Sequence, residues 1–178
     1  RNDNAYNANN PIHRFSNFFD FIIASKFNPA FPYYRKPDPI ESFNLIPINP
    51  EPMGIEKSIC NFKESPYFRR FLTLPEILVI KINILGVDRN GGYYKKFDKT
   101  PIPIQIELQT ENTKEDRGKH KNEKALYSLF AAVMHIGDDA SGGHYMTVVN
   151  SCDRIIVCDD HDIWGLNDEY FMNFLEQN

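Results

Sequence analysis

The stretch "HYMTVVNSCDRIIVCDD" (144–160) decides the fold of this chain, because it contains two apolar runs separated by a short polar turn. Residues 144–150 and 154–159 are rich in β-branched side chains, which favour strands. We predict an antiparallel hairpin whose turn is centred on Ser151 and Cys152. The end of the second strand then carries a pair of carboxylates.

The predicted register places His144 opposite Asp159 and Val148 opposite Ile155. Directly paired residues hold their β-carbons about 4.5–5.5 Å apart, so a carboxylate can reach an imidazole nitrogen. An odd-length turn or a bulge would break this pairing. A carboxylate orients a histidine and stabilises its imidazolium, so His144 is a candidate base for a Cys or Ser nucleophile. The same pattern also fits a His and an Asp that lie at the end of a hairpin and have no catalytic role.

The remaining segments predict an α+β domain with an antiparallel sheet. Residues 11–26 have apolar side chains at helical spacing and predict a helix, whereas the prolines after residue 28 predict irregular structure. Later segments predict strands, and the end of the chain predicts a second helix that Asn167 caps. The expected β segments are 74–85, 102–108, 125–136, 144–150 and 154–159, and the second helix is 166–177.

The composition favours one folded domain over residues 1–178. A net charge of -4 gives no reason to expect nucleic acid or a membrane surface as partner, and no apolar run approaches the roughly 20 residues of a membrane helix. The three cysteines, Cys60, Cys152 and Cys158, form neither a disulfide framework nor a zinc motif, which favours a reducing, intracellular compartment. The histidines lack a recognised ligand spacing, so no metal or other cofactor is expected.

Four ordered motifs resemble the C-terminal half of the ubiquitin-specific protease family of cysteine deubiquitinases. They occupy residues 74–163, about half of the chain, and no single one would suffice. The matching residues are Leu74, Pro75, Leu78 and Ile80; Tyr127, Leu129, Ala131, His135 and Gly137; Gly143, His144 and Tyr145; and Asp159 with Asp160.

The resemblance implies a papain-like cysteine protease fold. Residues 1–27 would form a thumb-like helical segment, residues 28–70 an irregular Pro-rich segment, and residues 71–178 the palm sheet with a C-terminal helix. The family's zinc-bearing fingers would be reduced or absent, because the segment before the Leu-Pro strand is short and has no Cys-x-x-Cys pair.

The resemblance also implies roles for individual residues. His144 would be the catalytic base, Asp159 its orienting carboxylate and Asp160 an auxiliary carboxylate. Two loops, 137–143 and 86–95, would shape a channel for the tail of ubiquitin. The residues that line this channel and bind ubiquitin or a ubiquitinated protein would be Gly142, Gly143 and Tyr145.

The nucleophile is where the sequence departs from the family. Alignment of "NDNAYNANNPIHRF" with the family's cysteine motif puts Tyr6 or Ala5 at the position of the cysteine. Strand alternation points Cys158 away from His144. Two hypotheses follow: an isopeptidase whose nucleophile is missing from this chain, and an inactive pseudo-deubiquitinase that binds ubiquitin or acts as a scaffold. A third is an unrelated α+β binding domain.

Overall fold

The described residues form two compact units. The structure is a computed structural model that describes residues 19–27, 40–96, 99–112, 122–140, 142–151 and 154–167. The first unit contains the described residues up to Ile48, together with those of Ile59–Lys81 and Glu107–Ala125. The second unit contains the described residues of Asn49–Ser58 and Ile82–Ile106, together with those from Leu126 onward. Of the helical segments in these ranges, none has the length and apolarity to cross a membrane.

The first unit contains a three-stranded antiparallel sheet. Strand β1 (Phe21–Phe27) lies between β2 (Ile40–Phe43) and β4 (Tyr67–Phe71), so both of its edges are hydrogen-bonded. Phe21 and Ile23 are only 1% and 0% exposed, and the ring of Phe21 packs edge-on at 5.9 Å from that of Phe71. This sheet therefore forms a large part of the unit's core.

The predicted helix over 11–26 is wrong from Phe21 onward, where the chain forms β1. Residues 11–18 lie outside the described residues. Ile22 and Ile23 are β-branched and fit a strand as well as a helix, so apolar spacing alone did not separate the two structures. Pairing with two strands that lie far along the chain decided between them.

The prediction of irregular structure over 28–70 is also wrong for most of its described part. Besides β2 and β4, this part contains β3 (Ile46–Ile48) and helix α2 (Ile55–Glu64), while 28–39 lie outside the described residues. The prolines fall where regular structure tolerates them. Pro47 lies in β3, which pairs with one strand only, and Pro66 stands between α2 and β4.

The other strands form short pairs. The predicted strand 102–108 is confirmed for residues 105–108, which belong to β8, whereas 74–85 contains only β5 and the first residue of β6. The segment "DRNGG" (88–92) forms a turn, in which Asp88 Oδ1 accepts hydrogen bonds of 2.8 Å from the amides of Asn90 and Gly92. The pairs are β3 with β5 (Ile80–Ile82), β6 (Leu85–Val87) with β7 (Tyr93–Lys95), and β8 (Gln105–Gln109) with β9 (Lys124–Ser128).

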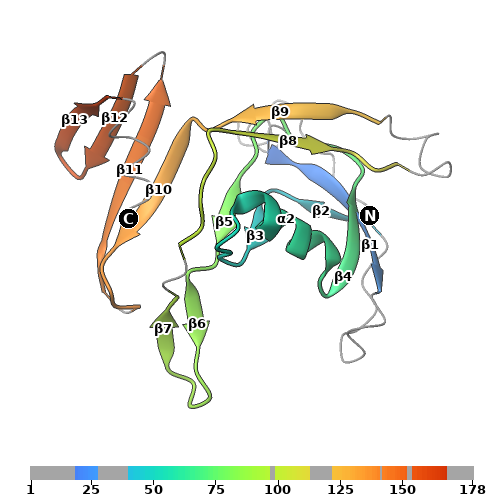
Figure 1. Cartoon of the computed structure of the whole chain (residues 1–178), viewed down its shortest axis with the longest axis horizontal. Coiled ribbons are helices and arrows are strands. Elements are labelled where there is room, and N and C mark those ends of the chain that lie inside the picture. Colours follow the sequence, from blue (N-terminus) through green and yellow to red (C-terminus); the bar gives the residue numbers. More distant parts are fainter. Residues whose placement is uncertain are drawn as a thin grey trace, which may run out of the picture. The chain divides into compact units, whose positions relative to one another are not determined.

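A four-stranded antiparallel sheet dominates the second unit, drawn from orange to red in Figure 1. Its strands follow one another along the chain and confirm the α+β class. One face packs around Met134, Val148, Ile155 and Val157. In order, the strands are β10 (Ala131–Ile136), β11 (His144–Ser151), β12 (Arg154–Asp159) and β13 (Asp162–Leu166).

The predicted strands of this sheet are confirmed in part. The segment 125–136 is divided between β9 and β10, which belong to different sheets. The segments 144–150 and 154–159 correspond to β11 and β12. Strand β13 was not predicted. It includes Leu166, which the sequence assigned to the start of the C-terminal helix. Residues 168–177 of that helix lie outside the described residues. The assignment of 1–178 to a single domain stays a prediction.

Candidate active site

The hairpin of β11 and β12 has a different register from the one that the sequence predicted. Val148 pairs with Val157, not with Ile155, and Ser151 pairs with Arg154. The turn is thus centred one residue further along the chain, and each partner shifts by two residues. Because side chains alternate with a period of two, a shift of two leaves every side chain on its predicted face.

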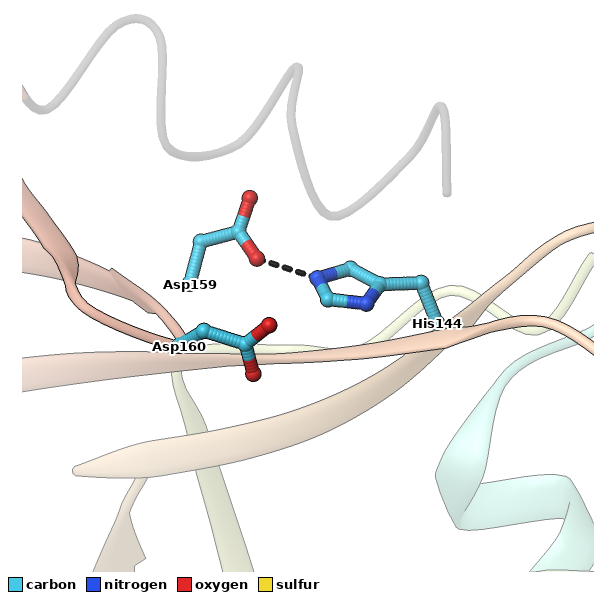
Figure 2. Close-up of side chains that lie close together, drawn as sticks. All are labelled: His144, Asp159 and Asp160. Atoms are coloured by element: carbon cyan, nitrogen blue, oxygen red, sulfur yellow. Dashed lines mark hydrogen bonds and ion pairs between the residues drawn. The ribbon is translucent and has the colours of Figure 1, made fainter.

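His144 and Asp159 meet at the end of this hairpin (Figure 2), as the sequence predicted, although they are not directly opposite. The pairing of β11 with β12 ends at Thr147 and Cys158, so His144 and Asp159 lie beyond it on the same face. Diagonal neighbours on one face remain within reach of long side chains. Nε2 of His144 contacts Asp159 Oδ1, and an ionised carboxylate only accepts, so Nε2 carries the hydrogen.

Asp160 approaches the same imidazole from the turn that joins β12 to β13. Its backbone has φ of 49°, the left-handed conformation that Asp tolerates better than most residues. The potential ligand atoms of His144, Asp159 and Asp160 all lie within 4.8 Å of one another. Figure 2 shows both carboxylates beside the imidazole ring.

The two carboxylates raise the pKa of His144. The hydrogen bond that His144 donates to Asp159 is the main cause, the negative charge of Asp159 adds to it, and that of Asp160 contributes less. The site is open to solvent, since the side chains of His144 and Asp159 are 45% and 30% exposed. Because Nε2 is bound to Asp159, Nδ1 is the nitrogen left for proton exchange with a nucleophile or a leaving group.

The same three side chains offer a nitrogen and carboxylate oxygens to a cation. Among the residues that the structure describes, they are the one cluster of three His, Cys, Asp or Glu side chains close enough together to hold a metal ion. Exposed acidic groups often gather without an ion, and His144 already bonds Asp159. The expectation of no metal stays a prediction.

Gly143, which precedes His144, is required by its surroundings. Its φ is 149°, and a β-carbon there would lie 2.3 Å from His135 Nε2 and 2.7 Å from the carbonyl oxygen of Ile136. A β-carbon on Gly142 would meet open space. Tyr145 pairs directly with His135 across β10 and β11, with ring centroids 5.0 Å apart, and remains 66% exposed. The three predicted channel residues are thus adjacent to His144, and their role in binding stays a prediction.

Lys95 is a neighbour of this site that the sequence did not indicate. Its ammonium donates hydrogen bonds to the carbonyl oxygens of His135, at 3.0 Å, and of Gly137. It also lines a hollow between β7 and residues 138–140, within the two loop segments expected to shape a channel. No local pattern marks this lysine, because its partners lie about 40 residues further along the chain.

None of the cysteines in the described part of the chain lies beside His144 on the sheet. Cys158 pairs with Thr147 and, adjacent to Asp159 in β12, points to the opposite face. Cys60 is exposed on α2. Cys152, and the positions Ala5 and Tyr6 that align with the family's cysteine, lie outside the described residues.

Comparison with known proteins establishes the family to which this chain belongs. Residues 13–176 match the family model described as "Ubiquitin carboxyl-terminal hydrolase". The chain is 29% identical over 104 residues to ubiquitin carboxyl-terminal hydrolase 4 of Arabidopsis thaliana, and 36% identical over 78 residues to ubiquitin carboxyl-terminal hydrolase 10 of Mus musculus. The chain therefore belongs to the ubiquitin carboxyl-terminal hydrolase family, in its ubiquitin-specific protease branch.

The fold agrees with this assignment. The structure resembles a chain in the SAGA Ubp8/Sgf11/Sus1/Sgf73 DUB module bound to ubiquitin aldehyde, with a TM-score of 0.70 and 16% sequence identity. That likeness covers 88% of this chain and 39% of the other. The match to the Arabidopsis relative covers 58% of this chain and 27% of that relative. The match to the mouse relative covers 43% of this chain and 10% of that relative. The chain thus corresponds to part of the length of these relatives.

Proposed function

We propose that this chain carries the histidine and carboxylate half of a cysteine-type deubiquitinase active site. The observation that carries the proposal is the bond of His144 Nε2 to Asp159, with Asp160 beside it. Asp159 sets the tautomer and orientation of the imidazole, and Asp160 adds negative charge that favours its protonated form. His144 is then poised to receive a proton from a thiol and later to release it.

Ubiquitin is the proposed partner. The family's description names it, and two similar solved structures are described as bound to ubiquitin aldehyde and to monoubiquitin. Gly142, Gly143 and Tyr145 would line the path of the ubiquitin tail toward His144. The small residues would let an extended peptide approach the backbone closely.

In the proposed reaction, a thiolate adds to the carbonyl carbon of the terminal glycine of ubiquitin. The tetrahedral intermediate collapses as the isopeptide C–N bond breaks, and His144 protonates the departing lysine amine. His144 then takes a proton from water, whose oxygen displaces the thiolate from the thioester. The family's cysteine aligns with Ala5 or Tyr6, so its motif does not identify the cysteine that supplies this thiolate.

A second candidate function is that of a ubiquitin-binding pseudo-deubiquitinase. The placement of the cysteines favours it: Cys158 points away from the face of Asp159, and Cys60 is exposed on a helix. Positions 5 and 6, which align with the nucleophile, hold Ala5 and Tyr6. Such a chain would keep the binding surface and the histidine without forming an acyl-enzyme.

One experiment tests the proposal and separates its two forms. The chain is incubated with ubiquitin that carries a C-terminal electrophile, and unmodified ubiquitin is titrated by calorimetry. An adduct that is lost on changing one cysteine establishes a nucleophile within the chain, and His144→Ala should then slow its formation. Binding without an adduct favours the pseudo-deubiquitinase. Absence of both adduct and binding would contradict ubiquitin as the partner.

A further inference from the structure

Lys95 ties two segments of the second unit together beside the candidate site. It ends strand β7, and its ammonium reaches the carbonyl oxygens of His135 and Gly137. These carbonyls flank Ile136, the last residue of β10. Both bonds are therefore made where the strand ends and the loop toward His144 begins.

The edge of the sheet explains why a lysine is suited to this place. Strand β10 is the first in the order β10-β11-β12-β13, so its outer edge has no neighbouring strand within that sheet. Carbonyl groups at such an edge need other donors, and an ammonium group supplies three hydrogens from one atom. Hydrogen bonds from a charged donor are stronger than those between neutral groups.

The contact between the two ends of the loop connects the position of Lys95 to that of His144. Gly137 has φ of 124°, and a β-carbon on it would lie 3.3 Å from the α-carbon of Gly143. The two ends of the loop thus touch. Gly143 also lies against the imidazole of His135. A shift of Gly137 would therefore displace Gly143, the residue bonded to His144.

We propose that Lys95 is a positioning residue that holds Gly137, and through it Gly143 and His144, in the arrangement that places His144 beside Asp159. By the same bonds it fixes one wall of the hollow lined by Tyr93, Tyr94 and residues 138–140. An effect of Lys95 on ubiquitin affinity rests on the function proposed above. An effect of Lys95 on the loop and on the position of His144 is independent of that function.

Lys96 provides a matched control. It lines the same hollow and carries the same charge, but its ammonium bonds only Asn49 Oδ1, at 3.3 Å on the exposed surface, among the interactions seen for it here. A loss of binding caused by charge alone would therefore appear in both lysine variants. A loss caused by the two carbonyl bonds would appear at Lys95 only.

The experiment compares Lys95→Met, Lys95→Arg and Lys96→Met with the parent chain by NMR. In Lys95→Met we expect hydrogen exchange at the amides of Gly137 and Gly143 to accelerate about tenfold or more, the size of effect expected for one charge-assisted hydrogen bond. The pKa of His144 should fall toward that of an ordinary histidine as its contact with Asp159 loosens. Lys95→Arg, which keeps a charged donor, should restore much of both values, and Lys96→Met should match the parent.

Unchanged exchange and an unchanged His144 titration in Lys95→Met would overturn the proposal, as would equal effects in Lys96→Met. Lys95→Gln, which keeps a donor without the charge, provides the same test if Lys95→Met does not fold. Ubiquitin affinity is measured in parallel, and we expect a loss of about tenfold in Lys95→Met only. If the parent chain itself does not bind ubiquitin, the proposed function fails, while the NMR comparison still decides the role of Lys95.

Discussion

The two larger sheets of this protein differ in how their strands are connected. In the sheet β2-β1-β4, the strands come from residues 21–27, 40–43 and 67–71, with a helix and another strand between the last two. In the sheet β10-β11-β12-β13, each strand pairs with the next one along the chain (Figure 1). Sequence reasoning succeeded for most of the second sheet and failed for the first, because only consecutive hairpin pairing can be inferred from a local pattern.

The sheets also differ in where their chemistry lies. Strand β1 is buried along most of its length and contributes aromatic and aliphatic side chains to a core. The second sheet has a buried apolar centre, and its polar groups His144 and Asp159 stand at exposed strand ends. Substitutions in the first sheet should therefore change stability, whereas those at the ends of the second should change protonation and loop geometry.

The largest effect is expected in the core of the first unit. Phe71 is 2% exposed and packs on Phe21, so Phe71→Ala should lower the free energy of unfolding by about 3–5 kcal/mol. Urea denaturation measures this change. Phe68 lies on the same strand but is 46% exposed, so Phe68→Ala should cost about 1 kcal/mol or less. Equal losses in the two variants would contradict the assignment of Phe71 to the core.

The next effect is expected at the loop before His144. Gly143→Ala introduces a β-carbon at positive φ against His135, which should cost about 1–3 kcal/mol in unfolding free energy and displace the NMR signals of His144. The matched control is Gly142→Ala, whose β-carbon meets open space and should leave both measurements nearly unchanged. A stable Gly143→Ala variant with parent-like His144 signals would show that the loop does not depend on this glycine.

A smaller effect is expected on the protonation of His144. Asp159→Asn removes the hydrogen bond to a charged acceptor and the nearest negative charge, so the pKa of His144 should fall. Asp160→Asn should lower it less, because Asp160 acts through its charge only. An NMR titration of the imidazole signals measures both shifts. A larger fall in Asp160→Asn would reassign the orienting role to Asp160.

The smallest effect is a pH dependence of stability. Because folding raises the pKa of His144, the protonated histidine stabilises the folded state, fully below its unfolded pKa of about 6.5, and this contribution disappears as pH rises through the folded pKa. The parent should therefore exceed His144→Gln in unfolding free energy most at acidic pH. A difference that grows with rising pH would contradict the raised pKa.

The sequence by itself determined the strands 144–150 and 154–159 and the face that His144 shares with Asp159. These features depend on alternation with a period of two, which an error of two residues in register does not disturb. The four ordered motifs were sufficient for the family. The β-branched run around Ile22 and Ile23 was ambiguous, because the same residues can pack as one face of a helix or as a central strand.

Only the tertiary structure decided which strands flank β1, the actual register of the β11–β12 hairpin, and the role of Lys95. Each of these depends on partners distant in the chain, such as Phe71 for Ile23 and the carbonyls of His135 and Gly137 for Lys95. A linear sequence displays the spacing between neighbours, and it contains the distant contacts only implicitly. Those contacts become visible when the folded backbone brings their donors and acceptors within bonding distance.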